Sequence, residues 1–259
     1  MSSKIIFWIN DDLSALGLPN ILQERYNFDI FGIFDITDKS KKFFKKQKLI
    51  NFSKIWFFHD HINKTNQRPD REFLKLIEKK YKVDLGLLAS NDRFFNKFNE
   101  FYKFSPDEIL LILEQECKLF EKILDELKPD FIIMTITNVH HDHLFYKICQ
   151  ARGVKILILW QSNLRGRYVI ASRIDLIDHA EYNEKHNFGS FSEIQNYIKK
   201  YDSTSLIFAH TKIFQNSKIK YLQSALKYLF SDNSNVKTHF TYYGRTKFSV
   251  LRKTLINEI

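Results

Sequence analysis

Residues 129–160 read PDFIIMTITNVHHDHLFYKICQARGVKILILW, and this stretch decides the fold class. The nearly continuous apolar runs 131–137 and 155–160 predict strands that are buried on both faces. The segment between them favours a helix over about 144–151, with Gly153 as its C-terminal cap. A strand, a short helix and a second strand in this order are typical of a parallel βαβ unit.

The N-terminal part of the chain repeats this alternation. Apolar runs at 4–9, 28–34 and 54–58 predict three further strands, and residues 19–26 suit a short helix between the first two. We therefore predict an α/β protein with a Rossmann-like parallel sheet flanked by helices. Additional short helices are expected between residues 69 and 104.

A long helix is expected before the βαβ unit. Ser105-Pro106-Asp107-Glu108 provides an N-cap serine, a proline at the first helical position and the glutamate of a capping box. Apolar residues then recur at spacings of three and four as far as Leu127. For the whole chain we expect a Rossmann-like domain over 1–180 and a helical extension over 181–259.

The composition indicates a folded chain that favours anionic partners. Hydrophobic residues make up 44% of the 259, and 40 Lys and Arg against 30 Asp and Glu give a net charge of +10. Cys117 and Cys149 both fall in apolar helical patterns, which fits a reducing compartment. No signal peptide and no apolar run of about 20 residues is visible, so we expect a cytoplasmic protein. Peripheral contact with the inner face of the cell membrane stays open as an alternative to a fully dissolved protein.

Polar clusters follow several of the predicted strands. Ligands of parallel α/β sheets bind outside the carboxyl ends of the strands, so these clusters are the candidate site. They are Asn10-Asp11-Asp12, His59-Asp60-His61, Asn138 to His143 and Gln161 to Arg167. Because strands that run the same way bring their loops to the same edge, we expect one cleft. Its predicted members are His59, Asp60, His140, Asp142 and Arg165.

The densest cluster, His140-His141-Asp142-His143, has three interpretations. It is one residue short of the T-H-x-H-x-D-H string of metallo-β-lactamase-type hydrolases, with Asn138 in place of the first histidine, and imidazole and carboxylate bind zinc or iron. It also fits a general base or acceptor-binding loop, or a helix start with incidental histidines and an aspartate cap. Helices dominate the region before it, where such hydrolases have a β-rich layer, so we assign no metal ligand from the sequence.

The other loops carry weaker signals. His59 beside Asp60 is the pattern of an oriented base, and Arg165 and Arg167 suit phosphate or carboxylate ligands, but all of them also fit solvated loops. Asp11 fits a helix cap better than catalysis. The lysine-rich run 39–48 fits a solvated face or contact with an anionic membrane surface.

No P-loop, G-x-G-x-x-G fingerprint or G-x-S-x-G elbow occurs in the sequence. Their absence argues against a mononucleotide kinase, a standard NAD enzyme and an α/β-hydrolase.

Six short strings along the chain carry a family resemblance. They are WFFHDHI (56–62), NDRFF (91–95), FYKFSPDE (101–108), EQEC (114–117), QSNLRGRY (161–168) and YYGRTK (242–247). Together, over most of the chain, they resemble the N-terminal half of capsular and surface-polysaccharide biosynthesis glycosyltransferases of the GT-B type.

The resemblance implies two Rossmann-like domains that face each other across a cleft. The N-terminal one handles mainly the acceptor, here a glycan or lipid-linked glycan, and the C-terminal one holds the nucleotide sugar. The sequence covers only the first half. We therefore expect no cofactor in this half, a nucleotide-sugar donor in the missing half, no transfer by this chain alone, and no nucleic-acid partner.

The sequence thus predicts the acceptor-side half of a sugar-nucleotide-dependent glycosyltransferase for surface polysaccharide. The predicted catalytic residues are His140, Asp142, His59 and Asp60. The predicted substrate-binding residues are Asn10, Asp11, His141, Gln161, Arg165 and Arg167. Two alternatives stay open, a metal-dependent hydrolase centred on the cluster His140 to His143 and a non-catalytic binding or scaffold domain.

Overall fold

The fold is known from a computed structural model. It describes residues 2–10, 16–36, 38–98, 100–161, 168–175, 189–200, 223, 226–227, 229–230 and 239–257. The chain divides into two compact units, residues 1–157 with 232–259, and residues 158–231. The first unit contains every residue of the site described below. The predicted domain boundary near residue 180 stays a prediction.

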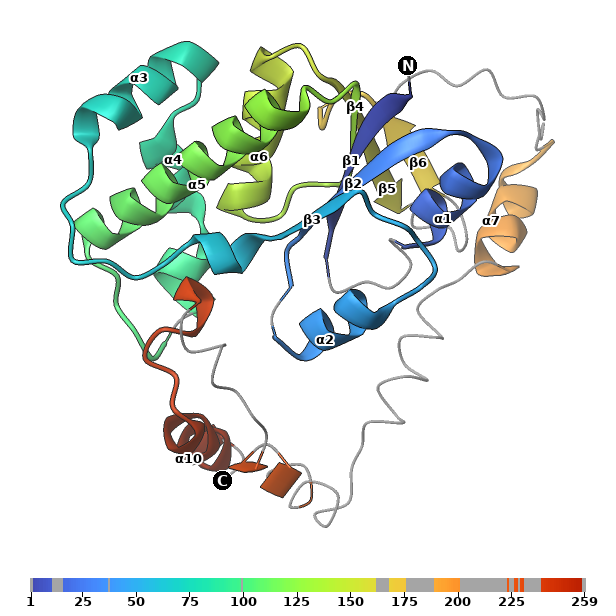
Figure 1. Cartoon of the computed structure of the whole chain (residues 1–259). Helices are drawn as coiled ribbons and strands as arrows, with labels where there is room; N and C mark the ends of the chain where they lie inside the picture. The colour runs from blue at the N-terminus through green and yellow to red at the C-terminus, as the bar shows by residue number, and fades with distance from the viewer. Residues whose placement is uncertain are drawn as a thin grey trace. The chain divides into compact units, whose positions relative to one another are not determined.

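The six strands form one sheet in the order β3-β2-β1-β4-β5-β6 (Figure 1). They are β1 (Ser3–Ile9), β2 (Phe28–Phe34), β3 (Lys54–Phe57), β4 (Phe131–Thr135), β5 (Lys155–Gln161) and β6 (Tyr168–Ala171). β2 and β4 both pair parallel with β1, and β3 pairs parallel with β2, which confirms the predicted Rossmann-like α/β fold. The chain leaves β1 in one direction along the sheet and later returns to its other side with β4. Sheets of this kind bind ligands at that switch point.

The sequence does not predict β6, the edge strand that pairs antiparallel with β5. Its run YVIA shows no alternation of polar and apolar residues that would predict a strand with one exposed face. By contrast, β1 and β2 are apolar at nearly every position because the sheet is covered on both faces, and Ile6, Ile9 and Ile30 are fully buried.

Helices connect the strands of the first unit. They are α1 (Gly17–Arg25), α2 (Asp38–Lys46), the 3₁₀ turn η2 (Phe58–His61), α3 (Arg71–Tyr81), α4 (Leu85–Asn91), the π-helical turn η3 (Phe94–Phe98), α5 (Pro106–Leu127) and α6 (His140–Ala151). Near the C-terminus this unit adds η5 (Phe240–Tyr242) and α10 (Lys247–Asn257), and the second unit contains α7 (Phe191–Lys200). Figure 1 shows α3, α4, α5 and α6 gathered as one group, in which α5 packs against α3 and α6.

The expected capping box starts α5. Glu108 N donates to Ser105 Oγ over 3.2 Å, and Ser105 N donates to a Glu108 carboxylate oxygen over 2.9 Å. The apolar stripe of the helix is buried, with Leu113, Phe120 and Ile123 inaccessible to solvent. The sequence prediction for this helix is confirmed at both ends.

The start of α6 differs from the prediction. The helix begins at His140 rather than near residue 144, so the histidine cluster lies in a first helical turn instead of a loop. The reason is Asp142, whose two oxygens accept from Asn138 N (2.9 Å) and Val139 N (3.1 Å). A carboxylate at the third helical position satisfies N–H groups that the helix itself leaves unpaired.

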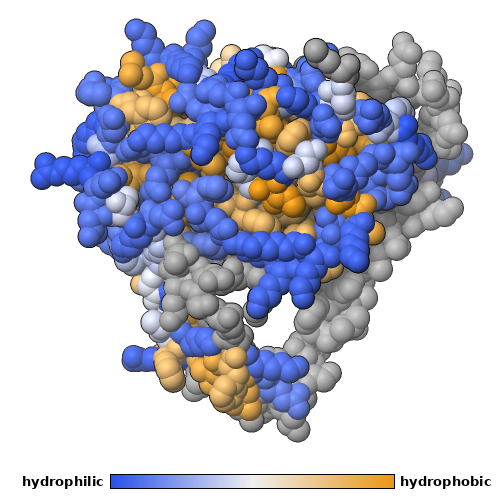
Figure 2. Space-filling view, viewed as in Figure 1, coloured by the Kyte–Doolittle hydropathy of each residue, from blue (hydrophilic) through white to orange (hydrophobic). Residues whose placement is uncertain are grey.

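Within the described residues, no helix is long and apolar enough to cross a membrane. Figure 2 shows the viewed face covered mostly by hydrophilic residues, with small groups of apolar ones between them.

Candidate functional site

A pocket with a volume of about 340 Å³ lies at the carboxyl edge of the parallel strands. Asn10 follows β1, Asp35 follows β2, His59 follows β3, and residues 138–142 follow β4, so four consecutive positions of the sheet contribute to it. The remaining wall comes from Phe94 and from Thr241, Tyr242 and Arg245 of the C-terminal segment. The edge predicted to carry the site therefore holds a pocket.

Asp35 links two histidines across this pocket. Its Oδ1 lies 3.0 Å from His59 Nε2, and its Oδ2 lies 2.8 Å from His141 Nε2. The backbone of Asp35 is fixed beside the end of β1, because Asp35 N donates to Ile9 O over 2.8 Å. An ionised carboxylate only accepts hydrogen bonds, so both Nε2 atoms carry a proton.

Charge and burial act against each other in this group. Burial raises the pKa of Asp35, but the charge of His141 and the hydrogen bonds from His141 and His59 outweigh it, so that the pKa falls well below its usual value. For His141, burial lowers the pKa, while the charge of Asp35 and its hydrogen bond raise it above the usual value. Asp35 is therefore a stable anion that fixes the orientation of both imidazole rings.

Aromatic rings pack against these two histidines. His141 stacks on Phe58 at 4.6 Å between ring centroids and lies 5.9 Å from the Trp8 ring. His59 stacks on His239 at 4.9 Å. This packing leaves the two linked imidazoles with few rotamers.

Four residues of the pocket carry a buried polar atom without a hydrogen-bond partner in the described part of the chain. These atoms are Asn10 Oδ1, His59 Nδ1, His141 Nδ1 and Thr241 Oγ1. Buried polar atoms are nearly always paired in folded proteins, and each unpaired one is destabilising by about 1–3 kcal/mol. Four residues that line one pocket thus carry polar atoms that the described residues leave unpaired.

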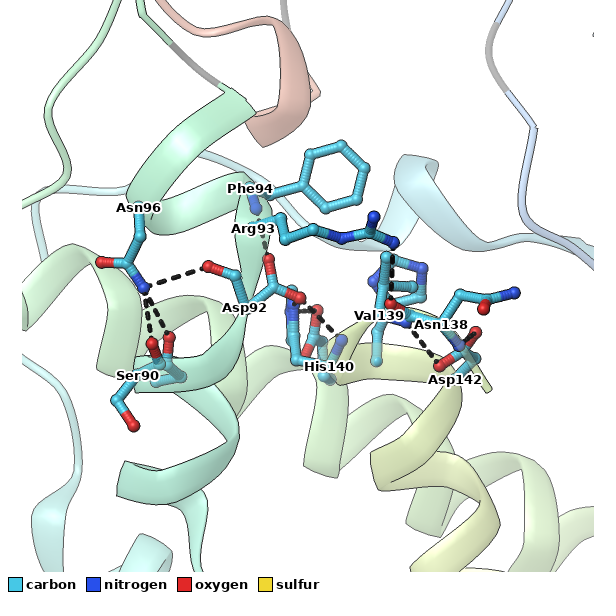
Figure 3. A network of polar contacts seen from close by, with 12 residues as sticks. Ser90, Asp92, Arg93, Phe94, Asn96, Asn138, Val139, His140 and Asp142 are labelled. Atoms are coloured by element: carbon cyan, nitrogen blue, oxygen red, sulfur yellow. Dashed lines mark hydrogen bonds and ion pairs between the residues drawn. The ribbon is translucent and has the colours of Figure 1, made fainter. Parts of the chain in front are cut away.

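His140 lies behind the pocket in a second polar group. Its Nδ1 is 2.8 Å from an Asp92 oxygen and its Nε2 is 2.9 Å from Glu116 Oε1, and the side chains of all three are 0% exposed. Its backbone N–H also donates to Asp92 over 2.7 Å (Figure 3). The ring is thus fixed between two buried carboxylates.

These two carboxylates decide the charge of His140. Burial lowers the pKa of this imidazole, but the charges of Glu116 and Asp92 and their hydrogen bonds raise it to about 10. Burial likewise raises the pKa of Asp92, whereas its hydrogen bonds with His140 lower it below the usual value. His140 is therefore an imidazolium at neutral pH in the absence of other ligands.

Asp142 serves as the cap of α6 and also lines the pocket, as Figure 3 shows for its contacts with Asn138 and Val139. Burial raises the pKa of this carboxyl, although His141 and the two backbone N–H groups act in the opposite direction. His143 points elsewhere, with its Nδ1 3.0 Å from Thr137 Oγ1.

Asp60 does not line the pocket. Its carboxylate forms an ion pair with Lys41 and lies 3.7 Å from His239 Nε2. Burial and the neighbouring charges of His59 and Lys41 lower the pKa of His239 to about 4, with Asp60 acting in the opposite direction. Asp60 thus contacts the outer side of the histidine stack.

The C-terminal segment of the first unit packs against residue 101 through a close backbone approach. Gly244 has φ +74°, and a Cβ at this position would collide with the carbonyl oxygen of Phe101. The guanidinium of Arg245 lies 5.7 Å from the Phe101 ring and 5.3 Å from the Tyr242 ring. A positive charge is thereby held at the rim of the pocket.

Of the residues predicted from the sequence, Asn10, His59, His141 and Asp142 line one pocket, with His140 directly behind it. Gln161 ends β5 in the part of the chain assigned to the second unit. The predicted residues Asp11, Arg165 and Arg167 lie outside the described residues.

The sequence does not single out Asp35, Asp92, Glu116, Thr241 or Arg245. Asp35 follows β2 directly, so the same rule that selected Asn10 and His59 could have selected it. Asp92 and Glu116 lie at a helix end and inside α5, where a carboxylate carries no signal of its own.

No protein-family model and no curated protein sequence matches the chain. Among solved structures, it is similar to a UDP-N-acetylglucosamine 2-epimerase, with a TM-score of 0.33 and 10% identity over 64% of this chain and 35% of that one. It is also similar to the PbgP3 protein from Burkholderia pseudomallei, with a TM-score of 0.26 and 8% identity over 62% of this chain and 52% of that one. The chain thus spans about a third of the first protein and half of the second. At these TM-scores neither likeness identifies an activity, and the case for function rests on the site.

Proposed function

We propose that this chain is the acceptor-side half of a sugar-nucleotide-dependent glycosyltransferase that acts on surface polysaccharide. The observation that carries the proposal is the pocket at the switch point of the sheet, in which Asp35 orients His59 and unpaired polar atoms gather. Sugars present many hydroxyl groups, so a polar pocket with both donors and acceptors suits a saccharide.

His59 is the proposed general base. Its Nε2–H donates to Asp35, which leaves Nδ1 of the neutral ring as the acceptor, and Nδ1 has no partner among the described residues. In the proposed step the acceptor hydroxyl gives its proton to Nδ1 while its oxygen bonds to the anomeric carbon, and the nucleoside diphosphate leaves with the electron pair of the broken bond. Asp35 stabilises the imidazolium that forms.

The pocket also provides a positive group for the departing diphosphate. Arg245 lines the pocket and is positioned by the rings of Phe101 and Tyr242. Guanidinium groups suit phosphate oxygens because their donors match the geometry of the anion. Most of the donor contacts belong to the second domain implied by the family resemblance.

The alternative hypothesis, a metal-dependent hydrolase, requires His140, Asp142 and His143 to bind one metal ion together. The described residues do not arrange them so, because Asp142 caps α6 with both oxygens and His143 faces Thr137. The scaffold reading, contact with an anionic membrane and a cytoplasmic location stay predictions.

Saccharide binding tests the proposal. Titration of the chain with capsule-type oligosaccharides, followed by NMR shifts, should give saturable binding that Thr241→Val weakens by about fivefold, since one hydrogen bond to a buried group is lost. Thr65→Val is the matched control, because Thr65 is a half-buried threonine that does not line the pocket. The proposal fails if no saccharide binds, or if nucleic acid binds instead with an affinity that falls steeply with salt.

A further inference from the structure

Three buried side chains, His141 in the pocket wall and Glu116 and His140 behind it, come together in a way that the proposed transfer step does not use. One ligand atom each from Glu116, His140 and His141 lies within 4.8 Å of the other two. The residues are 0%, 2% and 1% exposed. Glu116 comes from the middle of α5, and the two histidines come from the first turn of α6.

We propose that Glu116, His140 and His141 bind one divalent metal ion of the zinc type. Two imidazoles and one carboxylate form a donor set that zinc accepts in tetrahedral sites with an open fourth position. The proposal goes beyond the transfer reaction and does not depend on it.

Two unpaired atoms of these three side chains favour a bound metal ion. Glu116 Oε2 and His141 Nδ1 are buried and have no hydrogen-bond partner among the described residues. Both are lone-pair donors, and His141 Nδ1 is the available nitrogen of its ring because Nε2 is bonded to Asp35. An ion bound to both would remove two unpaired buried atoms at once.

The outer contacts of both histidines have the arrangement that metal-bound histidines need. Asp92 accepts from Nδ1 of His140, and Asp35 accepts from Nε2 of His141. A carboxylate on the second ring nitrogen fixes the ring and its tautomer and makes the other nitrogen a better ligand. Each histidine therefore has one ring nitrogen bonded to an aspartate and a second ring nitrogen that would bind the ion.

Only a small movement is required. Bonds of about 2.0–2.1 Å place the ligand atoms of a tetrahedral ion roughly 3.4 Å apart, so atoms at most 4.8 Å apart must approach by up to about 1.4 Å. His140 Nε2 already lies 2.9 Å from Glu116 Oε1, and the ion would replace the proton between them. Because His141 lines the pocket, the fourth position suits water or a ligand oxygen on that side.

Zinc binding by the whole chain tests this inference. Protein dialysed against a chelator and then against metal-free buffer is titrated with Zn²⁺, and bound metal is counted by elemental analysis. Co²⁺ in a parallel sample reports the ligand field through its visible absorption. We expect one tight ion per chain and a rise in melting temperature with Zn²⁺.

The variants distinguish this site from the histidines around it. Glu116→Gln and His141→Gln should each weaken zinc binding at least tenfold, by analogy with losses of about 10–100-fold for lesser, outer-shell changes. His143→Gln is the matched control, a neighbouring histidine outside the cluster, and should keep the wild-type affinity.

Two results would overturn the inference. One is wild-type protein with less than about 0.1 ion per chain after titration and removal of weakly bound metal. The other is a loss of affinity in His143→Gln as large as that in Glu116→Gln. If Glu116→Gln does not fold, His141→Gln and the wild-type count decide the question by themselves.

Discussion

Replacing His140 by leucine should strongly destabilise the first unit. The imidazole is the partner of Glu116 Oε1, and Glu116 Oε2 has none in the described part of the chain, so the substitution leaves a fully buried carboxylate without any donor. Asp92 is affected less, because it still accepts from the backbone N–H groups of residue 140 and Phe94.

The expected loss in the free energy of unfolding follows from the burial of the Glu116 carboxylate. Removing one partner of a buried ion pair is destabilising by about 3–5 kcal/mol, a large part of the roughly 5–15 kcal/mol by which a domain is stable. Replacing both partners by apolar residues is often close to neutral. The double variant His140→Leu with Glu116→Leu should therefore recover most of the loss.

Urea unfolding followed by circular dichroism measures both variants, with a chelator present so that metal binding does not contribute. With a slope of about 3 kcal/mol per molar urea, the midpoint of His140→Leu should fall by about 1 M or more. A loss below about 1 kcal/mol, or a double variant as unstable as the single one, would refute the assignment of His140 as the partner of a buried carboxylate.

Two further predictions concern the C-terminal segment. The pKa of His239 is lowered from 6.5 to about 4 in the folded protein, so the unfolded chain binds more protons between these pH values. The free energy of unfolding should therefore decline by up to about 3 kcal/mol as the pH falls from 6.5 to 4. His239→Gln should remove that part of the slope in urea midpoints across this pH range. Gly244→Ala should destabilise the protein by about 2 kcal/mol or more and weaken saccharide binding, because its Cβ meets the backbone of Phe101. Gly153→Ala, with a similar φ of +70° but open space around the new Cβ, should be destabilising by only about 1 kcal/mol. Thermal melts of both variants measure this difference, and equal losses would contradict the assigned role of Gly244.

The sequence predicts the strands β1 to β5 and the helix α5 well because their signals are local. An apolar run of six or seven residues predicts a strand from neighbouring residues alone. The capping box at Ser105 likewise predicts the start of α5 from four consecutive residues. The start of α6 is harder, since Val139 does not look like an N-cap and the cap comes from Asp142, three residues further on.

Only part of the candidate site can be predicted from the sequence, because some of its residues meet only in the folded protein. Strand ends identify Asn10 and His59, because parallel strands bring their following residues to one edge. The carboxylates that bind His140 cannot be predicted in this way. Glu116 and Asp92 come from helices 24 and 48 residues before His140, and only the packing of α4 and α5 against α6 brings them to it.

The central claim is that His59, oriented by Asp35, removes the proton of the acceptor hydroxyl. The direct test is the rate of sugar transfer by a full-length glycosyltransferase that contains this segment, with His59→Gln compared with the control His143→Gln. We expect His59→Gln to lower kcat at least about 100-fold with an unchanged urea midpoint, and the control to keep its activity. Full activity of His59→Gln would contradict the account.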